Sequence, residues 1–186
     1  MPAEIAIRTA RAADAASLKL LHRASLWGLG VFDYTLAEID SIVRHVQTLD
    51  PELIETGRYY VAEINGELAG SGGWSDHALV PAMPRSANTN RPMSGTPSAK
   101  LRAIFANPKF ARAGVGAALM AHIEAEARAA GLARAEGLAT LSSLRFYERI
   151  GYTALRRISM PLADGTMIGL VHMKKSLATA GGVRAA

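Results

Sequence analysis

The pattern of hydrophobic and polar residues in the N-terminal part of the chain predicts one strand followed by two helices. The alternating segment EIAIR at residues 4–8 is typical of a short strand. Asp14 is a predicted N-cap for a helix whose leucines share one side, at Leu18, Leu21 and Leu26. A second helix is predicted over residues 36–49, and Pro51 either ends it or opens a further turn.

Two hairpins are predicted from turn residues that lie between strand-like segments. Asn65-Gly66 joins YYVAEI to ELAGSGGW and supplies the positive φ angles of a type I′ turn. Asp164-Gly165 joins YTALRRISM to TMIGLVHMK in the last hairpin of the chain. Residues 77–99, after the first hairpin, are rich in Pro, Ser and Asn, and a loop of this length is usually either a functional lid or a disordered insertion.

A strand followed by a long helix is predicted in the second half of the chain. The strand covers KLRAIFA at residues 100–106, and the apolar face of the helix repeats at Val115, Leu119 and Ile123. Glu124 and Arg128 are spaced to pair on the solvent-facing side of this helix, and Gly131 is expected just after its C-cap.

A second strand–helix unit follows, at residues 132–140 and in SLRFYERI, with Ser142 as the expected cap and Gly151 as the closing residue. The resulting order of elements predicts an α/β (α+β) fold, a mixed sheet with helices on both faces. We expect a single domain over residues 1–176 and a flexible tail at residues 177–186.

Composition excludes several kinds of site. The 186 residues include no cysteine, which excludes a disulfide framework, a thiolate metal site and a cysteine nucleophile. The N-terminus lacks an apolar signal core and no apolar run is long enough to span a bilayer, so we expect a cytoplasmic protein without a membrane partner. The net charge of +5 comes from scattered basic residues, a pattern that does not favour nucleic acid as a partner.

The helix that carries Val115 begins in a glycine-containing turn, although glycine is about 1 kcal/mol worse than alanine inside a helix. A strand, a tight turn and a helix start together expose backbone N–H groups at the positive end of the helix, which can bind an anion. Gly114 and Gly116 would let a phosphate approach the backbone, and Arg112 adds a charge with fork geometry. Tight packing is the alternative reason for the two glycines.

A second motif lies about 30 residues downstream, in TLSSLRFYERIGY. Together, this segment and the ARAGVG turn resemble the GCN5-related N-acetyltransferase (GNAT) superfamily, whose signature is a [QR]-x-x-G-x-[GA] turn and an aromatic–Tyr–x–x–x–Gly–aromatic motif. Ala111 stands where the family usually has Gln or Arg, and Thr140 and Ser143 stand where Asn and Ala are frequent. The resemblance covers nearly the whole chain and implies a mostly antiparallel sheet that is splayed where the cofactor binds.

The resemblance also implies acetyl-CoA as the acetyl donor, with no metal. Its pyrophosphate would bind at Arg112, Ala113, Gly114, Val115, Gly116 and Ala117, and its pantetheine arm would lie along Ile104, Phe105 and Ala106, near Thr140 and Ser143. A backbone N–H of residues 104–106 would stabilise the oxyanion.

For catalysis, the resemblance implies that Tyr147 assists the leaving thiolate, although Tyr147 could instead be a packing residue. Glu136 is the candidate base, with Asp76, His77 or a water chain as alternatives. The predicted function is acetyl-CoA-dependent N-acetylation of an amine on a small molecule, a peptide or a protein. A non-catalytic acyl-CoA sensor and a basic nucleic-acid-binding module remain alternatives, and a homodimer remains open.

Overall fold

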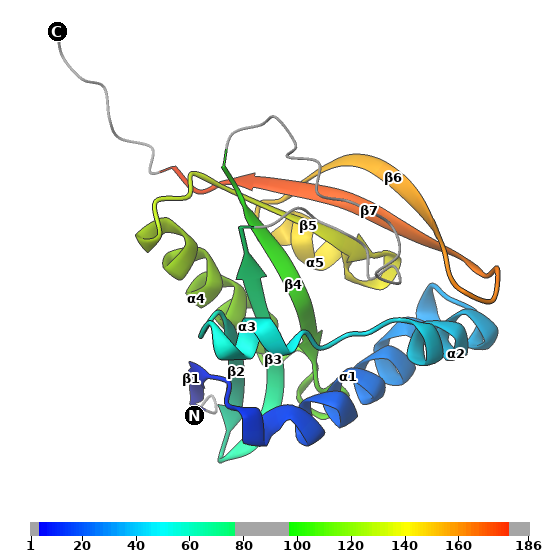
Figure 1. The fold of residues 1–186 in the computed structure, drawn as a ribbon, viewed down its shortest axis with the longest axis horizontal. Coiled ribbons are helices and arrows are strands. Elements are labelled where there is room, and N and C mark those ends of the chain that lie inside the picture. The colour runs from blue at the N-terminus through cyan, green and yellow to red at the C-terminus, as the bar shows by residue number, and fades with distance from the viewer. Residues whose placement is uncertain (1–3, 77–96, 179–186) are drawn as a thin grey trace, which may run out of the picture.

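The computed structural model describes residues 4–76 and 97–178, and in these ranges the chain forms a seven-stranded mixed sheet (Figure 1). The strand order is β1-β2-β3-β4-β5-β7-β6, and every neighbouring pair is antiparallel except the parallel pair β4 and β5. The mostly antiparallel sheet is therefore confirmed. Its strands are β1 (Ile5–Thr9), β2 (Tyr59–Ile64), β3 (Glu67–Ser75), β4 (Ala99–Ala106), β5 (Arg134–Thr140), β6 (Thr153–Pro161) and β7 (Met167–Ser176). Most of the predicted loop, His77 and most of the predicted tail lie outside the described residues.

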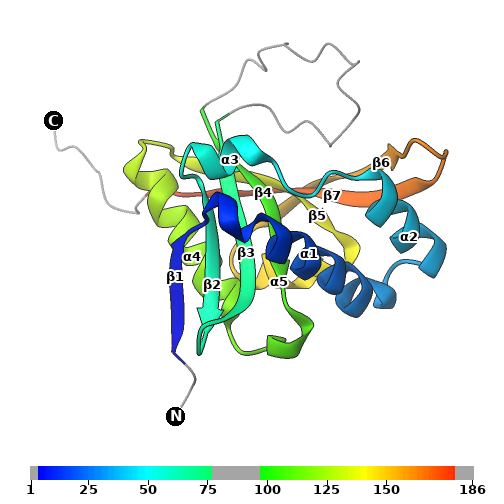
Figure 2. The same ribbon diagram turned by 60° about the horizontal axis from the view of Figure 1, so that its bottom comes forward.

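Helices cover both faces of the sheet, as predicted (Figure 2). The first face carries α1 (Ala15–Leu29), α2 (Leu36–His45) and α3 (Pro51–Glu55), and the second carries α4 (Val115–Ala129) and α5 (Leu144–Arg149). On the α4–α5 face, one continuous core cluster joins side chains of β2, β3, β4, β5 and β7. On the α1–α3 face, the core is divided into one cluster around Leu18 and Tyr59 and another around Ile39 and Ile168.

The sheet opens between its two parallel strands. β4 and β5 pair only at Ala99 with Ala135 and at Lys100 with Glu136. Beyond these positions the two strands run apart (Figure 1). The predicted splay is therefore present, and it leaves the rest of the β5-facing edge of β4 without a β5 partner.

The turns that depend on glycine are confirmed. Asn65 and Gly66 have φ angles of +51° and +76° in the turn between β2 and β3, as a type I′ turn requires. Gly131 follows the C-cap of α4 with a φ of +81°, and Gly165 has a φ of +86° in the connection from β6 to β7.

Of the predictions for the first two helices, the N-cap position is confirmed and the end of the second helix is wrong. Asp14 is the N-cap residue of α1, but its carboxylate makes no cap bond and instead accepts hydrogen bonds from the Arg11 backbone N–H (2.7 Å) and from Arg8 Nη1 (2.8 Å). Arg8 on β1 therefore holds Asp14 in a short turn ahead of the helix. The second helix ends at His45 rather than residue 49, and Pro51 opens α3, where the Asp50 carboxylate caps Glu52 N–H (3.0 Å).

Two predictions for the later helices are also wrong. Glu124 pairs with Arg128 (3.3 Å) but does not face solvent, because β7 brings Lys175 Nζ to its carboxylate oxygens (2.8 and 2.7 Å) and the residue is 4% exposed. Ser142 does not cap α5. That helix starts at Leu144 after a 3-10 turn, Leu141–Ser143, and the Ser142 and Ser143 hydroxyls bond to the Thr140 hydroxyl just before the turn (3.2 and 2.9 Å).

Candidate functional site

α4 begins without a side-chain cap, after a turn that contains two residues of positive φ. These are Arg112 (φ +66°) and Gly114 (φ +87°), which is the N-cap residue. The Ala118 N–H donates the first intrahelical bond, to the Gly114 carbonyl (3.0 Å). The N–H groups of residues 115–117 thus precede the helical ladder and lie at the positive end of the helix dipole. With the exposed Arg112 beside them, they can bind an anion.

The two glycines of this turn have different structural reasons. A Cβ on Gly114 would meet only Ile5 Cδ1 at 4.0 Å, so its left-handed backbone, and not crowding, favours glycine. A Cβ on Gly116 would lie 3.1 Å from Cζ of Phe146, so this glycine admits the aromatic ring of α5. Packing therefore accounts for Gly116, whereas Gly114 shapes an open turn.

The strand that leads to this turn has one edge available for pairing. Ile104, Phe105 and Ala106 are half-buried, and the last two pair with β3 on one side, Phe105 with Ser71 and Ala106 with Gly70. Because β5 has already diverged, an extended, amide-rich chain could pair with the other edge as an added strand.

A bulge in β4 precedes these residues, and a buried polar network holds it. Ala103 has a φ of +48°, and the register between β3 and β4 shifts here. Tyr59 Oη donates to the Ala103 carbonyl (2.9 Å), and Ser71 Oγ lies 3.1 Å from the same hydroxyl. His22 Nε2 lies 3.0 Å from Ser71 Oγ, and the imidazole stacks on the Phe105 ring, with centroids 4.2 Å apart.

The His22 side chain is 1% exposed, and burial lowers its pKa to about 4. Its second ring nitrogen, Nδ1, lies 2.9 Å from Thr48 Oγ1. The network thus joins α1, the segment after α2, and strands β2, β3 and β4. Our sequence reasoning missed it, although a histidine four residues after Leu18 on an apolar helix face was a signal.

Tyr147 lies on α5 in the core cluster that also contains Val115, the first residue of α4. Its ring packs edge-on against Phe146 and Tyr152, at centroid distances of 5.4 and 5.3 Å. Burial raises the pKa of Tyr147, so the hydroxyl is a proton donor at neutral pH and a weaker acid than free tyrosine. Thr140 and Ser143 lie between β5 and this helix and bond to each other through their hydroxyls (2.9 Å).

Glu136 lies where β4 and β5 last pair, and two cationic or titratable side chains contact it. Its Oε2 is 3.2 Å from Lys100 Nζ and 3.1 Å from His172 Nε2. Burial alone would raise the pKa of Glu136, but the hydrogen bond and charge of Lys100, with the bond from His172, lower it. His172 was not identified from the sequence, because its contact with Glu136 depends on the pairing of β5 with β7.

The alternative base Asp76 lies at the end of β3, where its carboxylate is 3.1 Å from Arg58 Nη1. Arg58 also covers the ring of Trp74 at 4.6 Å, and Trp74 is buried, as expected of a packing residue. Asp76 therefore stays a candidate base, ion-paired at the strand end.

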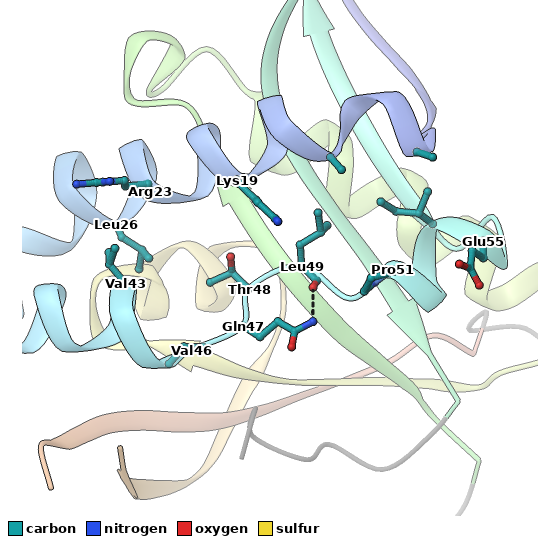
Figure 3. Close-up of a pocket in the computed structure, with 13 residues that line it drawn as sticks. Lys19, Arg23, Leu26, Val43, Val46, Gln47, Thr48, Leu49, Pro51 and Glu55 are labelled. Atoms are coloured by element: carbon teal, nitrogen blue, oxygen red, sulfur yellow. Dashed lines mark hydrogen bonds between the residues drawn. The ribbon is translucent and has the colours of Figure 1, made fainter. Parts of the chain in front are cut away.

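A pocket of about 530 Å³ lies on the α1–α3 face, between α1, α3 and the segment that joins α2 to α3 (Figure 3). Lys19 and Arg23 lie on one wall and Leu49 on another. None of the predicted cofactor residues lines it. The pocket adjoins the buried polar network through Thr48, which lines the pocket and contacts His22.

The part of the chain that the structure describes lacks two other kinds of site. Residues 4–76 and 97–178 contain no group of three or more His, Asp or Glu side chains that could hold a metal ion. Within the same ranges, no helix is both long and apolar enough to cross a bilayer.

Comparison with known proteins gives a family and a fold. Residues 26–152 match the model of the acetyltransferase (GNAT) family. A GCN5-related N-acetyltransferase from Rhodopseudomonas palustris is 19% identical, with 95% of this chain and 98% of that protein aligned and a TM-score of 0.72. The PaiA N-acetyltransferase of Thermoplasma acidophilum, solved with coenzyme A, is 17% identical over 93% of this chain and 99% of its own, at a TM-score of 0.65. The ribosomal-protein-alanine N-acetyltransferase of Brucella melitensis is 17% identical over 92% of this chain and 99% of its own, at a TM-score of 0.62. No curated protein sequence gives a significant match.

Proposed function

Because the chain belongs to the acetyltransferase (GNAT) family, we propose that it transfers the acetyl group of acetyl-CoA to an amine of a small molecule, a peptide or a protein. The observation that carries the proposal is the uncapped start of α4, the first long helix after β4, which is a strand with an open edge. A pyrophosphate and an amide-rich arm are the two parts of CoA that match these features. The structural likeness to PaiA, which was solved with coenzyme A, supports the same assignment.

In this proposal the turn at residues 112–117 binds the pyrophosphate, through backbone N–H groups and the Arg112 guanidinium. The pantetheine arm pairs with Ile104, Phe105 and Ala106, and Thr140 and Ser143 border the gap from the β5 side. Gly114 gives the turn its left-handed backbone, with a φ of +87°, and the nearest atom to a Cβ at this position, beyond the adjacent residues, would be 4.0 Å away, so the space beside it is open.

The chemistry is direct attack of the amine on the thioester. The amine nitrogen bonds to the carbonyl carbon, a backbone N–H of residues 104–106 stabilises the oxyanion, and the carbon–sulfur bond breaks. Tyr147 assists the leaving thiolate. A tyrosine with a pKa of about 10 gives its proton to a thiol of about 8.5 at a cost near 2 kcal/mol. Burial of Tyr147 increases that cost, so its main contribution is a hydrogen bond to the developing thiolate.

The amine must be neutral to attack, and a lysine-like amine with a pKa of about 10.4 is mostly protonated at neutral pH. Glu136 belongs to this deprotonation step, because it is the carboxylate at the point where β4 and β5 separate.

The test is a thiol-release assay with acetyl-CoA against a panel of small amines and peptides, combined with calorimetric binding. We expect amine-dependent thiol release. Arg112→Ala should weaken acetyl-CoA binding about 10- to 100-fold, the range of one charged hydrogen bond, while Arg11→Ala removes an exposed arginine elsewhere and should leave binding unchanged. Binding of acetyl-CoA without turnover on any acceptor would favour the sensor instead, and equal binding by the Arg112 variant would refute the anion site.

A further inference from the structure

Three strands bring charged or titratable side chains together where the sheet begins to open. Lys100 comes from β4, Glu136 from β5 and His172 from β7, and their side chains are 16%, 14% and 16% exposed. Glu136 Oε2 contacts both of the others, Lys100 Nζ at 3.2 Å and His172 Nε2 at 3.1 Å. This cluster was not predicted as a unit.

The cluster lies on the face of the sheet opposite the α4 turn. Side chains alternate along a strand, and Ala135, Ala139 and Met173 belong to the core under α4 and α5. Leu138 and Leu170, which alternate with them, belong to the core under α2. Glu136 and His172 share this second orientation. If the α4 turn binds the donor from one face, an amine that reaches this cluster approaches from the opposite face.

Glu136 by itself is a poor proton acceptor in this arrangement. Its carboxylate is shared by two positively charged or hydrogen-bond-donating groups, and these lower its pKa in spite of burial. The same contact defines the state of the imidazole, because a carboxylate at Nε2 favours the tautomer with the proton on that nitrogen. Nδ1 is then the nitrogen with a lone pair.

We propose that His172 takes the proton of the acceptor amine on Nδ1, and that Glu136 is a positioning residue that fixes its tautomer and orientation. This inference rests on the proposed acetyltransferase function. Carboxylates orient imidazoles in the same way at other catalytic and metal sites.

The proton balance is complete with groups of this chain. As the nitrogen–carbon bond forms, the amine nitrogen gives one proton to Nδ1, and the imidazolium is held by the Glu136 carboxylate. The electrons of the carbon–sulfur bond leave with sulfur, which accepts a hydrogen bond or a proton from Tyr147. Transfer of the imidazolium proton to water or back to a tyrosinate restores both residues, and the products are an amide and a free thiol.

Several cationic side chains lie near His172. Arg156 on β6 occupies the position paired with His172, and Lys174 lies two residues along β7 on the same face. Lys100 approaches from β4 through the shared carboxylate. An imidazolium formed among these cations depends on Glu136, the one carboxylate that contacts His172 among the described residues.

The test uses the full-length protein and an amine that it acetylates. His172→Ala should lower kcat about 10²- to 10⁴-fold, the usual range for a general base, with little change in the KM for acetyl-CoA. Free imidazole added to the assay should restore part of this activity. His172→Gln keeps an amide donor for Glu136 but has no base, so it should be stable and equally slow. Glu136→Gln should be impaired and should not respond to imidazole.

His122→Ala is the matched control, because His122 lies on α4 against the Tyr60 ring, on the face of the sheet opposite the cluster. It should keep kcat within a few-fold and show no imidazole effect. If the wild type is active and the kcat of His172→Ala is within a few-fold of the wild-type value, this inference alone is overturned. An inactive His172→Ala variant that binds acetyl-CoA but gains no activity from imidazole would overturn it as well. A wild type without turnover on any amine would overturn the proposed function together with it.

Discussion

The stability of the protein should fall between pH 7 and pH 5 because of one buried histidine. Burial lowers the pKa of His22 from 6.5 to about 4. In this interval the unfolded chain binds a proton at His22 and the folded chain does not, so the unfolded state gains stability as the pH falls. The stability is fully present above the unfolded pKa and is lost as the pH falls toward the folded one. The loss amounts to about 2 kcal/mol at pH 5 and about 3 kcal/mol at pH 4.

The assay is urea unfolding of the wild type and of His22→Gln at pH 7, 6 and 5, where most carboxylates stay ionised. His22→Gln should be less stable at pH 7, by roughly 1–3 kcal/mol, because the bonds to Thr48 and Ser71 are disturbed. Its loss between pH 7 and pH 5 should be smaller than that of the wild type by about 2 kcal/mol.

Leu18→Ala provides the matched control, since Leu18 is fully buried on the same helix and carries no titratable group. It should lower stability by about 2–5 kcal/mol at every pH and keep the wild-type pH slope. If His22→Gln loses stability with pH in parallel with the wild type, the buried histidine is not the cause and the reasoning fails.

Three further predictions follow from single contacts. Gly116→Ala should cost up to about 2 kcal/mol, because overpacking against Phe146 outweighs the gain in helix propensity. The double variant Gly116→Ala/Phe146→Leu should lose less stability from the alanine in urea unfolding than the single variant does. Lys175→Met should lower the free energy of unfolding by roughly 3–5 kcal/mol, because it leaves the Glu124 carboxylate buried without its nearest partner. A melting temperature equal to that of the wild type would contradict this. Tyr147→Phe should lower kcat with acetyl-CoA affinity unchanged, and the loss should shrink with an acetyl donor whose thiol has a lower pKa. If the variant keeps the wild-type kcat while chemistry is rate-limiting, Tyr147 is only a packing residue.

Local patterns predicted the order of elements and the turns correctly. Asn65-Gly66 and Gly131 specify their own backbone conformations, and the repeat of Val115 and Leu119 specifies a helix face, so no distant residue is needed to interpret them. The splay of β4 from β5 came from the resemblance to a family and not from periodicity, because strand pairing depends on residues far apart in the chain.

The errors and omissions share a physical cause, which is a partner supplied from elsewhere in the chain. Glu124 follows the buried Ile123 on the helix and was expected to face solvent. It is buried instead, because Lys175, 51 residues later in the chain, bonds to its carboxylate. The aromatic ring that requires glycine at Gly116 lies 30 residues later in the chain. The contact of Glu136 with His172 forms only when β7 pairs with β5. The sequence alone identifies such residues as polar or small but does not show which side chains they contact in the folded protein.

The way the core is divided explains how this sheet can open and remain stable. On the α4–α5 face, one continuous cluster spans both halves of the sheet, including Leu101 of β4 and Ala139 of β5. On the other face, the core separates into two clusters, and in the first of them the Tyr59 hydroxyl bonds to the carbonyl of the bulge residue Ala103. Burial on the first face therefore holds the strands together, while the divided second face leaves the backbone of β4 unpaired with β5. In the proposed reaction, the acyl donor and the amine would then meet at the edge of β4 that β5 leaves unpaired.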